Sequence, residues 1–384
     1  MIGRGSYLPR LWTLDGKGTK WLPIGAAPDS SGTCGWTLHQ VTTSQFQSRI
    51  DLFDGATDSI EPGETLLTIE RNSLEIWAGF VDTVDVDAHA GVFTVTASDY
   101  LNEFSRLVVR DLLDTQRGGQ YVDLHAAAVL SSAATGAYQF IDLGLRTQAG
   151  PNFVERQVSP SSPVYALDEL SSLADLGLDY FAIGRVIALI NRAEEIAPSA
   201  FQLDTESSWG RPPILRRTRA NYANRVWAVQ QSGILISPLD PPTDRALAEH
   251  IQAADKNVSN LEDFANTYRD QLSVSRTVVV PAGPLKTTAE LDIQDLTPTT
   301  IGDIITPAGR MKIRVLETKF TWKDGIAGDD PDDSGVEMVL GVPLAAPYRI
   351  SLIDAEATQA SILANVEDRV RKLENRAVIN GQVL

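Results

Sequence analysis

Apolar and polar side chains alternate with a period of two over much of residues 36–110, most regularly in residues 46–52, 74–80 and 92–97. Such alternation places successive side chains on opposite faces of a half-buried strand. Turn-forming pairs such as Asp54-Gly55 and Pro62-Gly63 separate the runs. Several short strands divided by turns predict an antiparallel sheet that closes into a small barrel or sandwich.

The pattern changes to helical spacing between residues 112 and 208. An alanine-rich stretch covers residues 122–134, and an amphipathic stretch covers residues 163–176 behind Ser162-Pro163, a favoured helix start. Two short strands, 178–182 and 185–191, follow and are joined at Gly184. The segment is therefore predicted to form a small α/β insertion.

Strand patterns return after Arg211-Pro212-Pro213. Strands are predicted at 214–219, 225–230 and 277–280, and a long strand at 311–322 is expected to form a hairpin with 336–340. The polar segment 243–272 between them is compatible with helix. The hairpin connection carries Asp329, Asp330, Asp332 and Asp333, which lack the alternating spacing of a calcium loop, so a solvated turn is favoured over a calcium site.

A charged, glycine-free helix is predicted over residues 352–376. Its apolar residues recur at intervals of three and four, as in the seam of a short coiled coil: Leu363, Val366, Val370, Leu373 and Ala377. Arg369 and Glu374 also match a pattern found in short trimeric coiled coils, in which the arginine reaches the glutamate of a neighbouring helix. A helix packed on its own domain is the alternative, and the narrow apolar stripe favours oligomerisation.

Together these patterns predict a β-rich α+β protein with two antiparallel β-barrel domains, an α/β insertion and a C-terminal helix. The expected boundaries are an N-terminal extension at 1–34, a first barrel at 35–111, the insertion at 112–210, a second barrel at 211–346 and an oligomerisation helix at 347–384.

Composition narrows the classes of function. Fifty acidic residues against 33 lysines and arginines give a net charge of −17, which disfavours a protein that binds nucleic-acid phosphates. No apolar run approaches the roughly 20 residues of a membrane span, and the N-terminus lacks the apolar core of a signal peptide, so synthesis in a cytoplasm is expected. A single cysteine, Cys34, excludes an internal disulfide.

No motif for catalysis, metal binding or cofactor binding is present. The sequence has no H-E-x-x-H, no G-x-S-x-G and no P-loop. The histidines stand apart and are expected to be solvated or locally hydrogen-bonded: His39, His89, His125 and His250. Trp12, Trp21 and Trp209 are candidates for stacking on sugars, although burial in a core or an interface is favoured. We expect no catalytic residue, no metal site and no cofactor.

Three short segments, taken in order, carry a family resemblance. The strand 75–81 contains Trp77 and Gly79 in an aromatic-x-Gly-apolar step, a later strand ends in Ala97-Ser98-Asp99-Tyr100, and residues 221–226 include Asn224 and Val226. Over about residues 35–345 the chain resembles the phage tail hub proteins, also known as baseplate hub or minor tail proteins, of long-tailed phages.

The resemblance implies a virion structural protein at the tail tip, assembled in the host cytoplasm and without enzymatic activity. It implies a homotrimer whose paired barrels form a pseudo-sixfold ring, with tail tube, distal tail and tape measure proteins as neighbours. DNA would only pass through its channel, which an acidic wall would allow without capture. The alternatives are a receptor- or carbohydrate-binding tail module and a tail-associated hydrolase.

Overall fold

The structure is a computed structural model. It describes residues 2–115, 119–155, 157–174, 176–192, 197–218, 223, 225–230, 233–236, 249–253, 261–262, 265–266, 269, 276–307 and 309–341. Contacts within the chain divide it into two compact units, Met1–Thr218 with Arg276–Arg349, and Arg219–Ser275 with Ile350–Leu384.

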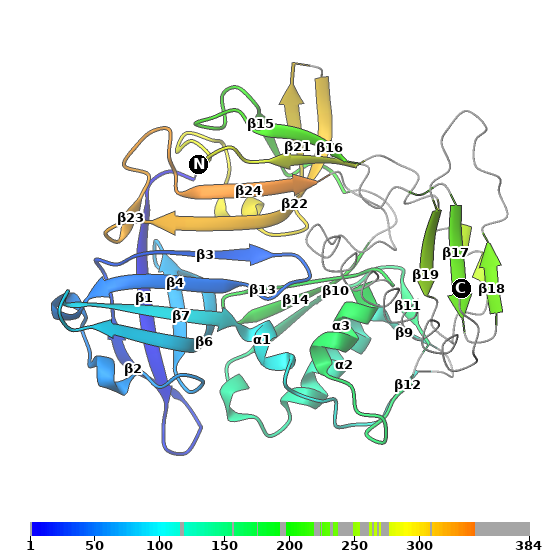
Figure 1. The fold of residues 1–384 in the computed structure, drawn as a ribbon, viewed down its shortest axis with the longest axis horizontal. Coiled ribbons are helices and arrows are strands. Elements are labelled where there is room, and N and C mark those ends of the chain that lie inside the picture. Colours follow the sequence, from blue (N-terminus) through cyan, green and yellow to red (C-terminus); the bar gives the residue numbers. More distant parts are fainter. Residues whose placement is uncertain are drawn as a thin grey trace, which may run out of the picture. The chain divides into compact units, whose positions relative to one another are not determined.

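In the first unit, strands from the first hundred residues pair antiparallel in one row (Figure 1). In β4, alternate residues are buried, among them Phe46, as the sequence pattern predicts. The helices η1 (Ile50–Leu52) and η2 (Thr57–Ser59) connect β4 to β5. The order of the strands is β3 (Ser31–Thr37), β4 (Thr43–Arg49), β7 (Val92–Asp99), β6 (Leu74–Asp87), β5 (Leu66–Arg71), β1 (Gly5–Leu14) and β2 (Trp21–Ala26).

The segment that the sequence pattern sets apart as an N-terminal extension is largely strand. β1 pairs with β5 from Tyr7 to Trp12 and with β2 on its other edge. Its buried residues alternate, at Gly5, Tyr7, Pro9 and Leu11. Glycine and proline occupy two of these four positions, so the alternation is hidden when only apolar residues are considered.

The long strand β22 (Gly309–Trp322) joins the early strands to the late ones. On one edge it pairs with β24 (Val336–Gly341), the predicted hairpin partner. On its other edge it pairs first with β21 (Ile301–Thr306) and then with β3. Further strands extend the sheet beyond β24 and β21: β20 (Arg276–Val280), β16 (Ile214–Thr218) and β15 (Phe201–Asp204).

The predicted fold class, a β-rich α+β protein, is confirmed. Through the pairing of β3 with β22, strands from both expected barrel regions belong to one 14-stranded sheet. A bridge between Lys323 and Ile326, and the pairing of β23 (Ile326–Ala327) with β1, lead from the end of β22 back to the N-terminal strand. The apolar interior therefore combines both ends of the sequence: Tyr7 stacks on Trp322 with ring centroids 4.9 Å apart.

The α/β part contains a three-stranded sheet in the order β10 (Gly144–Gln148), β14 (Val186–Asn191) and β13 (Leu178–Ile183). The helices α2 (Val122–Ala134) and α3 (Ala166–Ala174) pack with one face of this sheet and with α1 (Tyr100–Phe104) in a second apolar core. Shorter elements complete it: β8 (Leu113–Asp114) with β12 (Gln157–Val158), β9 (Gln120–Tyr121) with β11 (Phe153–Val154), and η3 (Tyr138–Phe140).

The second unit contains a small sheet in the order β18 (Gly233–Ile236), β17 (Arg225–Gln230) and β19 (Glu249–Ala253), with β17 and β19 parallel. The strand β19 lies in the polar segment that the sequence pattern describes as compatible with helix. The predicted helix 352–376 lies outside the described residues and stays a prediction. Within the described parts of the chain, no helix is long and apolar enough to span a membrane.

Candidate functional site

Four of the six residues that carry the hub resemblance, Trp77, Gly79, Asp99 and Tyr100, lie close together on β6 and where the neighbouring β7 leads into α1. Asp99 ends β7 and caps α1 by accepting a hydrogen bond from the backbone N–H of Leu101 at 3.0 Å. The backbone N–H and the hydroxyl of Thr42 both donate to the other carboxylate oxygen at 2.7 Å. The Trp77 indole N–H in turn donates to the Thr42 hydroxyl at 3.1 Å. The motif is therefore a buried hydrogen-bonded corner.

Burial is the main influence on Asp99. It raises the pKa of this carboxyl group from 3.8 to about 6, although the hydrogen bonds from Thr42 and Leu101 act in the opposite direction. Gly79 is required by close packing, because a Cβ atom there would collide with the backbone of Ser98. The Tyr100 ring is buried against Phe80, with centroids 5.2 Å apart in an edge-on arrangement.

The same corner connects the large sheet to the α/β part. The backbone N–H of Gly184, in the turn between β13 and β14, donates to the Ile76 carbonyl at 3.2 Å. The adjacent Arg185 donates from its backbone and its guanidinium to the Glu75 carboxylate, at 3.1 and 3.2 Å. The strand β6 thus carries Trp77 and Gly79 of the hub motif and also the residues to which the insertion is attached.

A buried ionic cluster makes a second connection between these parts. Asp179 on β13 accepts hydrogen bonds from Arg192 at 2.7 and 3.2 Å and from Arg314 on β22. His39, which follows β3, lies 3.0 Å from the same carboxylate through Nε2. The side chains of all four residues are at most 6% exposed. A carboxylate is thus shared by two guanidinium groups in a dry environment.

The protonation states in this cluster follow from burial and charge. Burial alone would raise the pKa of Asp179, but Arg314, Arg192 and the His39 hydrogen bond together hold this pKa well below 3.8. Burial lowers the pKa of His39 below 6.5, against the raising effect of Asp179, so the imidazole is neutral at pH 7. The cluster therefore carries one negative and two positive charges at neutral pH.

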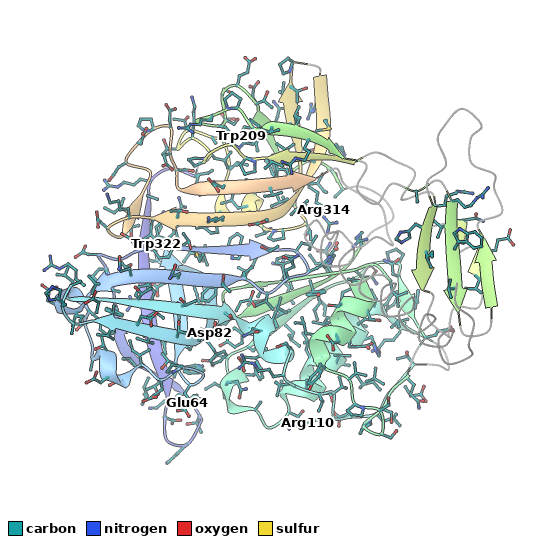
Figure 2. All side chains as sticks on the ribbon, viewed as in Figure 1. Glu64, Asp82, Arg110, Trp209, Arg314 and Trp322 are labelled. Carbon is teal, nitrogen blue, oxygen red and sulfur yellow. The ribbon has the colours of Figure 1, made fainter. Side chains whose placement is uncertain are left out.

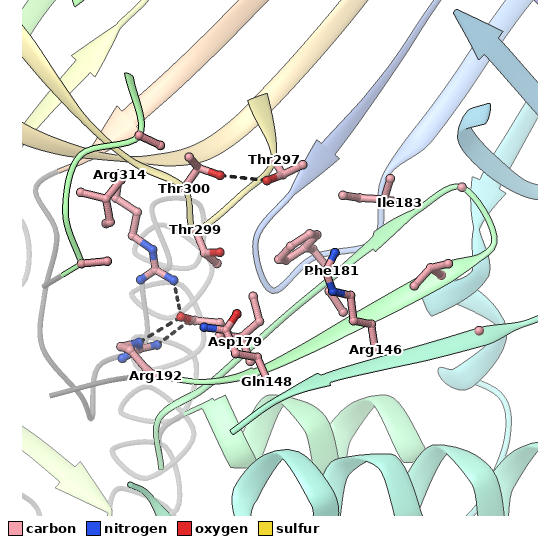
Figure 3. Close-up of a pocket in the computed structure, with 18 of the residues that line it drawn as sticks. Arg146, Gln148, Asp179, Phe181, Ile183, Arg192, Thr297, Thr299, Thr300 and Arg314 are labelled. Atoms are coloured by element: carbon pink, nitrogen blue, oxygen red, sulfur yellow. Dashed lines mark hydrogen bonds and ion pairs between the residues drawn. The ribbon is translucent and has the colours of Figure 1, made fainter. Parts of the chain in front are cut away.

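A groove of about 770 Å³ opens on the face of the three-stranded sheet opposite α2 and α3 (Figure 3). Alternation along the strands decides which side chains face it: Phe181 and Ile183 of β13 line the groove, whereas Leu178 and Tyr180 belong to the helix-covered core. The opposite wall comes from the segment after η4 (Ile293–Leu296) and from β22. The polar groups that line the groove include Arg146, Arg185, Arg192, Arg314, Thr297, Thr299 and Thr300.

The tryptophans considered for stacking on sugars are packed within the protein, as the sequence favoured. Trp21 and Trp209 are buried, at 9% and 1% exposure, and Trp209 lies at the strands of the large sheet (Figure 2), so neither offers a surface to a sugar. Trp12 donates to the Thr68 hydroxyl at 2.9 Å and has Arg185 over its ring. These tryptophans serve internal packing.

Among the polar candidates, His125 and the Asp-rich turn lie beside charged groups, but neither ring nitrogen of the buried His125 has a hydrogen-bond partner among the described residues. His125 on α2 is buried, 3.6 Å from the Glu169 carboxylate of α3. In the Asp-rich turn, Asp329 pairs with Arg4, and Asp332 pairs with Lys286. No three His, Cys, Asp or Glu side chains are grouped to hold a metal ion in the described part of the chain.

The remaining predicted positions belong to the second unit. Val226 is buried in β17 of the second unit, and Asn224 lies outside the described residues. The oligomerisation residues, from Leu363 to Ala377, also lie outside them and stay a prediction. The ionic cluster was missed by sequence reasoning, although Asp179 and Arg314 each stand in an apolar strand run, where an unpaired charge is costly.

Comparison with known proteins places the fold among those of phage tail proteins. No protein-family model and no curated protein matches the sequence. Among solved structures, the tail protein from Neisseria meningitidis MC58 matches with a TM-score of 0.60 and 11% identity, over 88% of this chain and 96% of that one. Prophage tail protein gp18 from Listeria monocytogenes EGD-e matches with a TM-score of 0.55 and 11% identity, over 94% and 99%.

A third match is the 43 kDa tail protein of prophage MuSo2 from Shewanella oneidensis, with a TM-score of 0.54 and 10% identity, over 87% of this chain and 97% of that one. At these identities the likeness is one of fold. It confirms, at the level of the fold, the resemblance to phage tail proteins that the segments around Trp77, Asp99 and Tyr100 predict.

Proposed function

We propose that this chain is a structural subunit of a phage tail tip or baseplate hub and that it has no enzymatic activity. The observation that carries the proposal is the extent of the fold likeness, which includes 87–94% of this chain and 96–99% of three tail proteins. Because the match includes nearly the full length of this chain and of each tail protein, the tail-protein fold makes up most of this chain and is not one module attached to it.

The proposed assembly is a homotrimeric ring that adapts the tail tube to the tip and leaves a channel for DNA. Tail tube, distal tail and tape measure proteins are its proposed neighbours. The net charge of −17 supports passage of DNA without binding, because an acidic wall repels the phosphate backbone. The channel is proposed to be lined by acidic side chains.

The deciding experiment is a cryo-EM map of intact tails from the phage that encodes this chain, with mass spectrometry of the same particles. We expect three copies in a closed ring at the tip. Absence of the chain from purified tails, or a location at the tail tip as a monomeric appendage, contradicts the proposal. Turnover of peptidoglycan or glycan by the purified chain would instead support the hydrolase alternative.

The oligomerisation helix is tested by paired substitutions along its predicted heptads. Val370→Asp with Leu373→Asp introduces charge at two seam positions, and Lys372→Asp with Asn375→Asp introduces the same residue outside the seam. We expect only the seam pair to reduce the incorporation of the chain into tails. Equal incorporation of both pairs contradicts an oligomerisation role for this helix.

A further inference from the structure

The groove on the three-stranded sheet differs in charge from the protein that surrounds it. It is lined by Arg146, Arg185, Arg192 and Arg314 and by three acidic side chains, so its lining carries one excess positive charge at neutral pH in a chain whose net charge is −17. The three acids are Glu75, Asp142 and Asp179.

The ion pairs show which guanidinium group is available to a ligand. Arg185 is occupied by Glu75 and Asp142, at 3.2 Å each. Arg192 and Arg314 share Asp179, so one of their two positive charges is not balanced by that carboxylate. Arg146 is exposed and has no ion-pair partner in the described part of the chain.

The positive charge that Asp179 does not balance lies in the buried pair of guanidinium groups. Nη1 of Arg192 is buried, and it has no hydrogen-bond partner within the described residues. Arg146 on β10 and the cluster around Asp179 on β13 lie on the two strands that flank β14, so roughly 10 Å separates them across the sheet. The groove therefore offers an accessible guanidinium group near a second, buried source of positive potential.

The strand that carries Arg146 is also an edge strand. β10 pairs with β14 and ends the row of the three-stranded sheet. An edge strand presents a row of backbone N–H and C=O groups to which an extended peptide can add as a further strand. A peptide in that position places every second side chain on the groove face, about 7 Å apart.

From the edge strand, the exposed Arg146 and the excess positive charge, we infer that the edge of this groove along β10 binds an acidic peptide segment in extended conformation. The peptide lies beside β10 as a fourth strand of this sheet, with one carboxylate on Arg146 and its alternate side chains on the groove face. The backbone pairing distinguishes such a segment from a free carboxylate or phosphate, which gains only the contact with the arginine.

The test measures binding of two matched peptides to the purified full-length chain by isothermal titration calorimetry. The probe is acetyl-Thr-Glu-Thr-Glu-Thr-Glu-amide, and its control carries glutamine in place of each glutamate. We expect the acidic peptide to bind at least about tenfold more tightly than the control, since a charge-assisted contact contributes that much, and to weaken as salt is raised. Its success does not depend on the proposed place in a tail.

Matched variants locate the site. Arg146→Gln is expected to reduce affinity about tenfold. Arg216→Gln removes an exposed arginine from β16, the edge strand of the large sheet, and is expected to leave affinity unchanged. Equal losses for both variants, or no loss for Arg146→Gln, overturn the inference.

Two further outcomes also overturn it. Free glutamate that binds as tightly as the peptide shows a site for small anions. Binding that appears only in a chain with Glu194→Gln and Glu195→Gln, two residues outside the described ranges, shows that the protein's own carboxylates supply the counter-charge.

Discussion

Removing Arg314 from the buried ionic cluster tests whether this cluster stabilises the fold. Arg314→Met keeps an unbranched apolar side chain on β22 but withdraws one of the two guanidinium groups that hold Asp179. Losing one partner of a buried ion pair costs about 3–5 kcal/mol, because the remaining charge stays in a dry site. Asp179 keeps its two hydrogen bonds from Arg192 and its contact with His39, so we expect the lower end, about 3 kcal/mol.

The matched control is Arg49→Met. Arg49 also pairs with an aspartate, at 2.6 Å from Asp51, but these two side chains are 63% and 61% exposed. Water and salt screen such a pair, so we expect little measurable change in stability. Urea unfolding, followed by tryptophan fluorescence, gives the free energy of unfolding of both variants. A similar small loss for both would refute the assigned role of the buried cluster.

The pH dependence of stability in the acid range tests the same cluster independently. The pKa of Asp179 is held well below 3.8, so its contribution to stability is complete above pH 3.8 and is lost as the pH falls through the lower folded value. The difference in unfolding free energy between the native protein and Arg314→Met should therefore shrink at the acid end. A difference that stays constant down to that range would contradict an electrostatic origin.

Gly79→Ala should destabilise the protein by about 1–3 kcal/mol, because the new methyl group collides with the backbone of Ser98, whereas Gly16→Ala, which meets no neighbouring atom, should change the melting temperature little. Asp99→Asn should remove a pH dependence of the unfolding free energy between pH 4 and 6. In this range the folded carboxyl group, with a pKa of about 6, keeps a proton that the unfolded chain releases, so burying Asp99 lowers the stability of the native protein by about 3 kcal/mol above pH 6. His39→Gln should reduce the loss of stability below pH 6.5, where the unfolded chain binds a proton that the buried imidazole does not. If the pH dependence of the unfolding free energy is unchanged in either variant, the role assigned to that residue, Asp99 or His39, is contradicted.

The sequence predicts those elements whose signal is local. The helix at residues 122–134 is found with the predicted bounds, and the hairpin of the long strand with 336–340 is present. The helix predicted at 163–176 begins later, at Ala166, because Tyr165 pairs with Val108 as a β-bridge. Here a tertiary contact overrides the helix-start signal of Pro163.

The features that a single sequence could not supply depend on pairings between distant residues. Asp179 and Arg314 are 135 positions apart, and the pairing of β3 with β22 joins segments separated by almost 300 residues. The hub corner was predicted as a motif, but its chemistry, with Thr42 donating to Asp99 from 57 positions away, required the fold. Charged residues within apolar strands indicated that ion-pair partners exist, but the sequence did not identify those partners.

The cluster around Asp179 also raises the question of why charge is used where apolar packing would suffice. A buried ion pair often contributes no more stability than apolar residues of similar volume, but it can specify how two elements are placed. We therefore expect the combined change Asp179→Leu, Arg192→Met and Arg314→Met to keep the free energy of unfolding close to the native value. Amide hydrogen exchange in β13 should nevertheless become faster, because the α/β part loses a directional connection to β22. Unchanged protection of the β13 amides in a stable variant would show that the apolar core alone fixes this arrangement, and that the ion pairs add nothing to its specificity.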